Sequence, residues 1–286
     1  MSIDYDTILN WSFEDIVQTY TQRDSMLYAL GLGLGFNQTD TRELRFVYEA
    51  GLQTFPTMPV VLGHPGPWMT NPRAAINMVK VLHAEQHLDI HIPLPPEGTV
   101  IARNRVREVV DKGAEKGALI ITERKIYDRD AGDCYCTQKS VAFARGDGGF
   151  GGPVTTSDKP ATIPGREPDF IVDIPVSTQS ALLYRLSGDY NPLHADPEIA
   201  QKAVFDRPIL HGLASFGVAA RALLGGLGIE DSSALTGIGL RFSAPVYPGE
   251  VISTSVWEEA GKFNFRSRVN ARDVTVLNNG YAELSI

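Results

Sequence analysis

The segment IPLPPEGTVIARNRVREVVDKG (residues 92–113) decides the expected fold, because a second segment repeats its plan. In APVYPGEVISTSVWEEAGK (residues 244–262), prolines again lead into a Pro/Glu/Gly turn, and a strand-like run follows. Each passage also contains a second turn, at Lys112–Gly113 and at Ala260–Gly261. Strand–turn–strand patterns are common, so coincidence is the alternative. We interpret the repeat as a duplicated domain.

A glycine- and proline-rich stretch separates the two passages. Residues 144–169, ARGDGGFGGPVTTSDKPATIPGREPD, show no hydrophobic period, which is typical of a linker. We therefore expect an N-terminal unit over residues 1–145, a linker over residues 146–169 and a C-terminal unit over residues 170–286.

Each unit offers an apolar helix and several strands. RDSMLYALGLGL (residues 23–34) is apolar at helical spacing, and ILHGLASFGVAARALLGGL (residues 209–227) is apolar nearly all round. The first helix is expected to bury one stripe, made by Met26, Leu27, Leu30 and Leu34. Antiparallel strands are expected over residues 119–127, 139–144, 251–257 and 263–269. The predicted fold class is α+β, with a buried helix against an antiparallel sheet in each unit.

Composition excludes several classes of partner. The 286 residues carry 26 Lys and Arg against 34 Asp and Glu, a formal charge of −8, so we expect no nucleic acid partner. No apolar run reaches membrane-spanning length, so no membrane partner is expected. The start MSIDYDTILNWSFEDIV has no basic region, and the end AELSI is not an SKL-type peroxisomal signal. We expect a cytoplasmic location, or a peroxisomal one for a fragment of a larger eukaryotic enzyme.

Patterns that suggest nucleotide or metal binding are weak. GLGLG (residues 31–35) and GDGGFGG (residues 146–152) lack the dinucleotide-binding spacing. His83, His87 and His91 recur every four residues, which on a helix would form a metal-binding face. The sequence around them alternates like a strand, which would put all three on one strand face at increasing separation. We therefore expect no metal.

The stretch RLSGDYNPLH (residues 185–194) is the strongest candidate for a catalytic site. Asp189, Asn191 and His194 lie within six positions beside turn-forming Gly and Pro residues. Each one alone has a structural alternative, because Asp and Asn commonly form turns and cap helices. Together they indicate acid–base chemistry, since a histidine beside a carboxylate can orient a water and take its proton. Downstream, the helix start at Gly212 presents free backbone N–H groups that can polarise a carbonyl oxygen.

These residues carry a resemblance to a known family. YRLSGDYNPLHADPEIA (residues 184–200) and FDRPILHGLASFG (residues 205–217) resemble the signature of hydratase 2, the MaoC-like (R)-specific 2-enoyl-CoA hydratases. Further stretches, among them YTQRDSMLYALGLG (residues 20–33) and KVLHAEQ (residues 80–86), are similar to the hydratase 2 part of peroxisomal multifunctional enzymes type 2. The resemblance covers nearly the whole chain. It implies a double hot-dog fold, in which each of two units wraps an antiparallel sheet around a long helix.

The resemblance also implies a reaction and roles for four residues. The family, a class of hydro-lyases in fatty acid metabolism and β-oxidation, adds water reversibly to trans-2-enoyl-CoA and forms (3R)-3-hydroxyacyl-CoA. By matching positions, His194 would be the base toward C3 and Asp189 the proton donor to C2. Asn191 would hold this dyad in geometry, and the Gly212 N–H would bind the thioester oxygen. The first unit lacks a second copy of the motif and would hold the acyl tail.

Substrate contacts carry over from the same positions. They are His83, Ala84, Lys112, Tyr190, Pro192, Leu193 and Phe242. Lys112 would bind a CoA phosphate, with a solvated turn lysine as the alternative, and Ala84 stands where relatives usually have glycine. No cofactor is expected because CoA is part of the substrate, and a homodimer is usual for the fold. The alternatives are a hot-dog dehydratase acting on another thioester (branched, steroid side-chain or acyl-carrier-protein) and a noncatalytic acyl-CoA-binding subunit.

Overall fold

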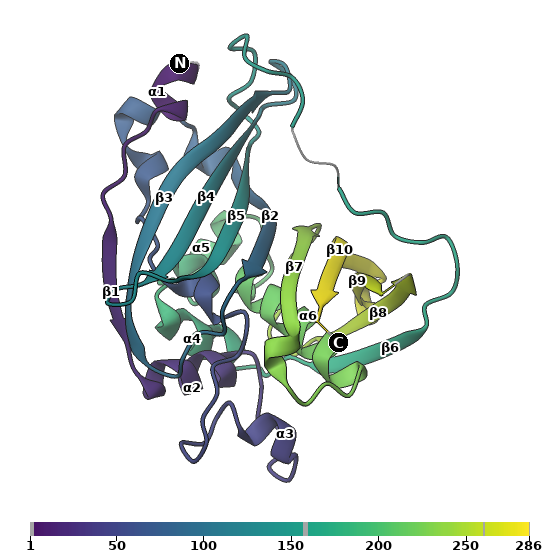
Figure 1. Ribbon diagram of the computed structural model, residues 1–286. Helices are drawn as coiled ribbons and strands as arrows, with labels where there is room; N and C mark the ends of the chain where they lie inside the picture. Colours follow the sequence, from purple (N-terminus) through teal and green to yellow (C-terminus); the bar gives the residue numbers. More distant parts are fainter. Residues whose placement is uncertain (1–2, 157–159, 260, 286) are drawn as a thin grey trace.

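One antiparallel sheet of ten strands forms the frame of the protein, in the order β1-β3-β4-β5-β2-β7-β10-β9-β8-β6 (Figure 1). The computed structural model describes residues 3–156, 160–259 and 261–285. The strands are β1 Ile16–Tyr20, β2 Val81–Ile90, β3 Gly98–Asp111, β4 Ala118–Asp128, β5 Cys134–Ala144, β6 Phe170–Pro175, β7 Leu235–Phe242, β8 Val251–Glu259, β9 Lys262–Val269 and β10 Val274–Leu284. The helices are α1 Tyr5–Leu9, α2 Gln22–Gly31, α3 Thr41–Leu44, α4 Ser180–Tyr184, α5 Pro197–Lys202 and α6 Gly212–Gly226.

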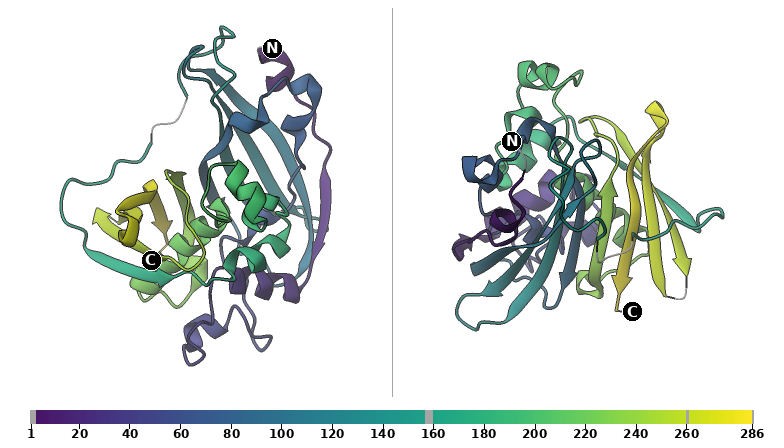
Figure 2. Two further views of the ribbon diagram at one scale, coloured as in Figure 1. Left: turned by 180° about the vertical axis from the view of Figure 1, so that it is seen from behind. Right: turned by 90° about the horizontal axis from the view of Figure 1, so that it is seen from above.

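The sheet is built twice from the same plan. The first half runs β1-β3-β4-β5-β2, and the second runs β6-β8-β9-β10-β7 when it is read from the opposite edge. The two halves join where β2 pairs with β7, and Figure 2 shows the helices gathered on one side of the continuous sheet. The two passages that suggested duplication supply β3 and β8, which occupy equivalent positions. The expected double hot-dog fold is therefore confirmed.

The predicted linker has neither helix nor strand over its described residues. Residues 157–159 of the linker lie outside the described part of the chain, as does Ala260 of the predicted second turn.

The glycine-rich start of the linker packs around Asp111, at the end of β3. The Asp111 carboxylate accepts hydrogen bonds from the N–H groups of Gly149 and Gly151, both at 2.7 Å. A Cβ on Gly148 would lie 2.2 Å from a backbone oxygen, so the glycines serve close chain packing.

The second unit has the long buried helix that its sequence predicts. α6 packs against β6, β7 and β8, and its middle turns are buried on all sides. Close approach requires small residues here, because a Cβ on Gly217 would lie 2.6 Å from Leu32 and one on Gly226 would lie 2.6 Å from Phe170. This packing explains why the segment is apolar nearly all round.

The first unit differs from the expectation. α2 has ten residues, and it buries Ser25, Tyr28 and Ala29, while Leu30 of the predicted stripe is 43% exposed. The predicted stripe is therefore only partly correct, because Leu34 is buried and Met26 and Leu27 are half-buried, but Leu30 is exposed. The reason is the neighbour: α2 and α4 follow equivalent strands and pack on each other, with the Tyr28 and Tyr184 ring centroids 5.7 Å apart. A long helix is thus present in the second unit, whereas α2 is short.

The loop at residues 58–64 takes part of the space of a long helix in the first unit, and it is fixed through its main chain. Polar side chains on the inner face of the sheet hydrogen-bond to its peptide groups. Gln138 donates to one carbonyl at 2.7 Å, Arg124 donates to another at 2.8 Å, and Gln18 accepts from an N–H at 2.7 Å. Because the peptide groups are held by the sheet, the loop side chains are free to line a pocket beside the catalytic loop.

Val204, just after α5, adopts a left-handed conformation that glycine prefers. Its φ is 66°, and its side chain is 92% exposed, so it gains little packing in return. We expect Val204→Gly to raise the free energy of unfolding by about 1 kcal/mol, because relief of the Cβ strain exceeds the entropy cost of glycine. Thermal unfolding measures the change. Val204→Ala keeps the Cβ and should gain less, and a lower melting temperature for Val204→Gly would contradict the prediction.

Candidate active site

Two consecutive turns shape the catalytic loop. The chain leaves the 3₁₀ turn η5 (Arg185–Ser187) through Gly188. The φ of Gly188 is 117°, a conformation that glycine adopts without steric strain. The Asp189 carboxylate then accepts a hydrogen bond from the Asn191 N–H at 3.1 Å. Asn191 Oδ1 in turn accepts from the N–H of Leu193 at 3.1 Å, which caps the 3₁₀ turn η6 (Pro192–His194). Asn191 thus organises the loop from both its main chain and its side chain.

Asp189 and His194 converge at this loop. A carboxylate oxygen of Asp189, a ring nitrogen of His194 and a ring nitrogen of His211 lie within 4.8 Å of one another. Asp189 is exposed, whereas His194 is 8% exposed. The Nδ1 atom of His194 lies 2.9 Å from the carbonyl oxygen of Ile209. Because a carbonyl can only accept, Nδ1 carries the proton and Nε2 keeps a lone pair, which suits a base.

Burial also keeps His194 neutral. It lowers the pKa of the imidazole below its ordinary value of 6.5, against the opposing effects of the Ile209 carbonyl and Asp189. We therefore expect kcat/KM for hydration to stay constant from pH 8 down to about 6.5 and to fall only in more acidic buffer, where the base becomes protonated. Initial rates across this range test the prediction, with circular dichroism as the control for folding. An acid limb above pH 6.5 would contradict it.

His211 is a member of the site that sequence analysis missed. Its ring stacks on that of His194, with centroids 3.7 Å apart, and its Nε2 lies 3.2 Å from the main-chain oxygen of Asp189. Burial, together with the neighbouring His194, lowers the pKa of His211 to about 4. The sequence offered one signal, an imidazole directly before a helix start, but the 16 residues between the two histidines hide their contact.

Two histidines and one carboxylate are also a donor set for transition metals. Ring geometry makes that use unfavourable here. The planes of His194 and His211 differ by only 26°. A metal ion lies in the plane of each imidazole that binds it, along the nitrogen lone pair, and two stacked rings cannot both meet this condition. The arrangement is suited to moving protons instead.

The start of α6 faces the end of β7 and the start of β2. His211, the N-cap of α6, makes no side-chain capping bond within the described ranges, and the first N–H groups of a helix have no intrahelical acceptor. Gly212 is exposed, and a Cβ there would lie 3.3 Å from the ring of Phe242. The Phe242 ring lies 4.9 Å from that of His83. The structure thus brings Gly212, Phe242 and His83 together.

A β-bulge near the start of β2 corrects the expectation for the three histidines. His83 pairs with Ala142 of β5, whereas Glu85 pairs with Val141, so Ala84 is an extra residue in the strand. One extra residue moves the following side chains to the other face of the sheet. His83 and His87 therefore lie on opposite faces, and the prediction of a shared face is wrong.

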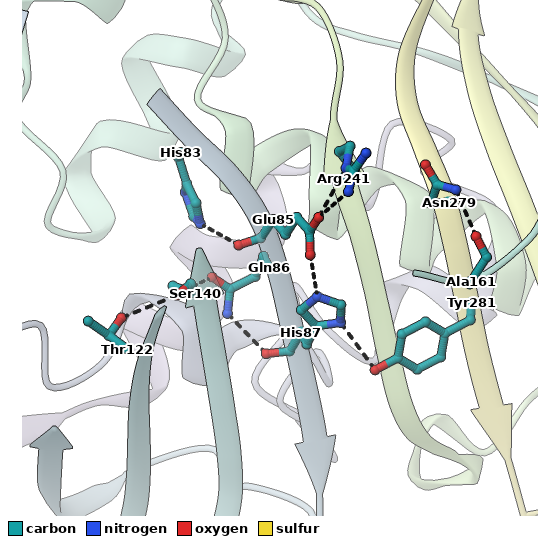
Figure 3. A network of polar contacts seen from close by, with 10 residues as sticks. All are labelled: His83, Glu85, Gln86, His87, Thr122, Ser140, Ala161, Arg241, Asn279 and Tyr281. Atoms are coloured by element: carbon teal, nitrogen blue, oxygen red, sulfur yellow. Dashed lines mark hydrogen bonds and ion pairs between the residues drawn. The ribbon is translucent and has the colours of Figure 1, made fainter. Parts of the chain in front are cut away.

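The opposite face carries a polar network at the seam between the units (Figure 3). Glu85 accepts from Arg241 of β7 at 2.7 Å and contacts His87 at 3.3 Å. His87 also lies 3.3 Å from the hydroxyl of Tyr281. These contacts lower the pKa of Glu85 to about 2 even though burial acts in the opposite direction. The network joins β2 to β7 and β10, which is a structural role for Arg241.

The remaining substrate-contact candidates are placed less uniformly. Tyr190 and Pro192 are exposed on the catalytic loop, and Leu193 is half-buried there. The Ala84 side chain packs with Val110, Ile121 and Val141, away from the ring of His83. Lys112 is exposed on the turn after β3. It lies three strands from β2, roughly 14 Å across the sheet, so it is not a neighbour of His83. Its contact with a CoA phosphate stays a prediction.

His64 is a second site residue that sequence analysis missed. It is the last residue of the loop at residues 58–64, and its Nδ1 accepts a hydrogen bond from the N–H of Gly66 at 3.1 Å. Partial removal of the imidazole from water lowers the pKa of His64 to about 4. The positive charge of Arg124 acts in the same direction, and the negative charge of Asp189 opposes it. His83 shows the same lowering, to about 4. Both residues are exposed at the surface.

Comparison with known proteins gives matches over both halves. A family model described as MFE-2 hydratase 2 N-terminal domain matches residues 18–146, and one described as MaoC like domain matches residues 159–279. The chain is 39% identical over 285 residues to the Mycobacterium tuberculosis enoyl-CoA hydratase ChsH3, covering 98% of each chain. It is 36% identical over 274 residues to the mouse peroxisomal multifunctional enzyme type 2, covering 93% of this chain and 36% of that enzyme.

Solved structures agree with these matches. The crystal structure of a MaoC-like dehydratase from Phytophthora capsici is 37% identical and covers 98% of both chains, with a TM-score of 0.86. A Mycobacterium tuberculosis protein described as a double hot-dog fold is 13% identical, with a TM-score of 0.58 over 98% of this chain and 97% of that one, and shows the fold alone. Among the described helices, none has the length and apolar character needed to cross a membrane.

Proposed function

This chain belongs to the MaoC-like hydratase 2 family, and from that membership we propose that it adds water reversibly to trans-2-enoyl-CoA and forms (3R)-3-hydroxyacyl-CoA. One observation supports this most directly: the Asp189 carboxylate and a ring nitrogen of His194 lie within 4.8 Å of each other on one loop. Such a pair can hold one water, which a noncatalytic acyl-CoA-binding subunit does not need.

The reaction can be written for the groups of this site. The neutral His194 takes a proton from the bound water while the water oxygen forms the bond to C3. Negative charge moves from the C2–C3 double bond toward the thioester oxygen, where the Gly212 N–H stabilises it. The proton that His194 has taken passes to the Asp189 carboxylate, which delivers it to C2. The new C–H bond ends the enolate-like state, and His194 and Asp189 return to their starting states. Both groups act from one loop, so the addition is syn.

Chiral analysis of the product tests the proposed function. Purified protein is incubated with trans-2-decenoyl-CoA, and the 3-hydroxyacyl product is resolved by chiral chromatography. We expect the 3R product. The 3S product would contradict the proposal, and release of free CoA from saturated acyl-CoA would indicate a thioesterase. A panel of branched, steroid side-chain and acyl-carrier-protein enoyl thioesters separates the fatty-acyl substrate from its alternatives.

A pocket between the units supports a place for the acyl tail. It has a volume of about 170 Å³ and borders the catalytic loop at Gly188. Its apolar walls are Leu27, Met58, Val61, Leu62 and Leu186, and its polar walls are Gln18, Thr19, Asp24 and Ser187. Most of these residues belong to the first unit, so we propose that this unit binds the tail while the second performs the chemistry.

Val61→Trp tests the acyl-tail pocket. The larger ring would fill much of the pocket, so we expect kcat/KM for trans-2-decenoyl-CoA to fall at least about tenfold, while crotonyl-CoA, whose chain is too short to enter, stays within about twofold. The matched control is Val17→Trp on the edge strand β1, where the native side chain is 58% exposed. Equal losses for both substrates would contradict this location of the tail.

The assembly and the compartment are also proposals. We propose a homodimer, which light scattering after size-exclusion chromatography can test. We propose a cytoplasmic location, or a peroxisomal one if the chain is part of a longer eukaryotic enzyme, as the name of the mouse relative would fit. The substrate partner is an acyl-CoA thioester, and no separate cofactor takes part in the proposed steps.

A further inference from the structure

His211 contacts every group to which the proposed function gives a role in proton transfer or charge stabilisation. Its Nε2 lies 3.2 Å from the main-chain oxygen of Asp189, and its ring stacks on His194 at 3.7 Å. It also directly precedes Gly212, whose N–H faces the thioester oxygen in the proposed mechanism. The side chain is 1% exposed, and the ring of Tyr184 lies 5.0 Å from its centroid.

The hydrogen bond of His211 fixes its tautomer. Asp189 presents a carbonyl oxygen, which only accepts, so Nε2 must carry the proton. The other nitrogen, Nδ1, is buried and has no partner among the described residues. Rotating the ring by 180° would break the hydrogen bond between Nε2 and the Asp189 carbonyl. Nδ1 has no partner among the described residues that would compensate for this loss. One orientation is therefore strongly favoured.

The hydrogen bond and the ring face of His211 restrain Asp189 and His194, respectively. The Asp189 loop is exposed, and its carboxylate accepts a hydrogen bond from Asn191 of the same loop, so its main chain gains an anchor to another segment from His211. The Ile209 bond holds one edge of His194 but leaves its ring able to tilt about that contact. A flat ring stacked at 3.7 Å restricts this tilt.

We propose that His211 is a positioning residue, in which the imidazole edge fixes the main chain of Asp189 and the imidazole face fixes the ring of His194. One side chain thereby sets the distance between acid and base. The inference rests on the proposed function. It explains the use of histidine at this place, because the role needs a planar ring and an N–H donor in the same plane.

Two substitutions separate these demands. His211→Gln keeps an N–H donor and loses the ring face, whereas His211→Phe keeps the face and loses the donor. We expect each to lower kcat for crotonyl-CoA hydration about 10- to 100-fold while KM stays within about twofold, because displacement of catalytic groups by about 1 Å has effects of this size. The matched control is His91→Gln, since His91 is exposed beside Thr137 and outside the site. It should leave kcat unchanged.

A second readout does not depend on activity. In ¹⁵N spectra of the native protein, the ring nitrogens of His194 should show a single tautomer with the proton on Nδ1. In His211→Phe and His211→Gln, we expect exchange-broadened or mixed signals. The proposal is overturned if kcat stays within about twofold in either variant, or if kcat falls only in step with a loss of folded protein. It is also overturned if the His194 signals are unchanged in both variants. A native protein without hydratase activity on the enoyl-CoA panel would overturn the proposed function instead, while the ¹⁵N signals still report on the position of His194.

Discussion

Replacing Asp189 with Asn is expected to lower kcat for the hydration of crotonyl-CoA by about 10³-fold, within the range found for loss of a catalytic acid or base. Asparagine has nearly the same size and shape. Its amide oxygen can still accept the hydrogen bond that the Asn191 N–H donates to the native carboxylate at 3.1 Å. The turn should therefore persist, and the main-chain contact with His211 should persist with it. What is lost is the acidic proton for C2.

The measurement must separate lost chemistry from a lost fold. The far-ultraviolet circular dichroism spectrum and the melting temperature of Asp189→Asn should match those of the native protein. Asp206→Asn is a matched control, because Asp206 is exposed and lies outside the dyad. If Asp189→Asn kept more than about a tenth of the native kcat, the carboxylate would not be the proton donor and the assignment would be wrong.

The catalytic loop could be predicted because its geometry is local. Asp189 and His194 are five residues apart, and Gly188 and the Asn191-Pro192 pair determine the turns between them. The helix start at Gly212 is local in the same sense, since it depends on the apolar run that follows. The repeated proline–turn–strand passage also sufficed for the fold, because each copy supplies an equivalent strand of the sheet.

Other features depend on contacts between distant segments. The bulge at Ala84 is one extra residue in an otherwise regular strand. The alternating sequence pattern does not show where such a residue lies, so it does not determine whether His83 and His87 share a face. His211 reaches the dyad only because α6 begins beside the catalytic loop. The buried face of α2 is set by its packing on α4, and its own sequence period points to a different stripe.

The first unit shows how far the duplication extends. It keeps the strand order of the second unit, but its inner face carries Asn104, Arg124 and Gln138, where a sheet that covers an apolar helix would carry apolar side chains. Arg124 lies in surroundings that lower its pKa to about 10, and it donates to loop carbonyls. The polar face therefore holds a loop instead of a helix.

Gly212→Pro is expected to lower kcat by about 10²- to 10³-fold, the usual effect of removing one oxyanion donor. Proline has no N–H, so the substitution removes the donor proposed to hold the thioester oxygen. The helix itself should tolerate the change, because Gly212 is the first residue of α6, where proline is favourable. The residue before it already suits a following proline, since His211 has φ −58° and ψ 137°.

Gly212→Ala is the matched control for Gly212→Pro. Both variants add a Cβ, which would lie 3.3 Å from the ring of Phe242, so both require the same small shift of that ring. Only alanine keeps the N–H. If the N–H stabilises the enolate-like charge, alanine should retain most of the native kcat while proline loses it, and KM should change little in either, because the charge develops in the transition state. Equal losses in the two variants would mean that the space beside Phe242 matters and that the thioester oxygen is held elsewhere.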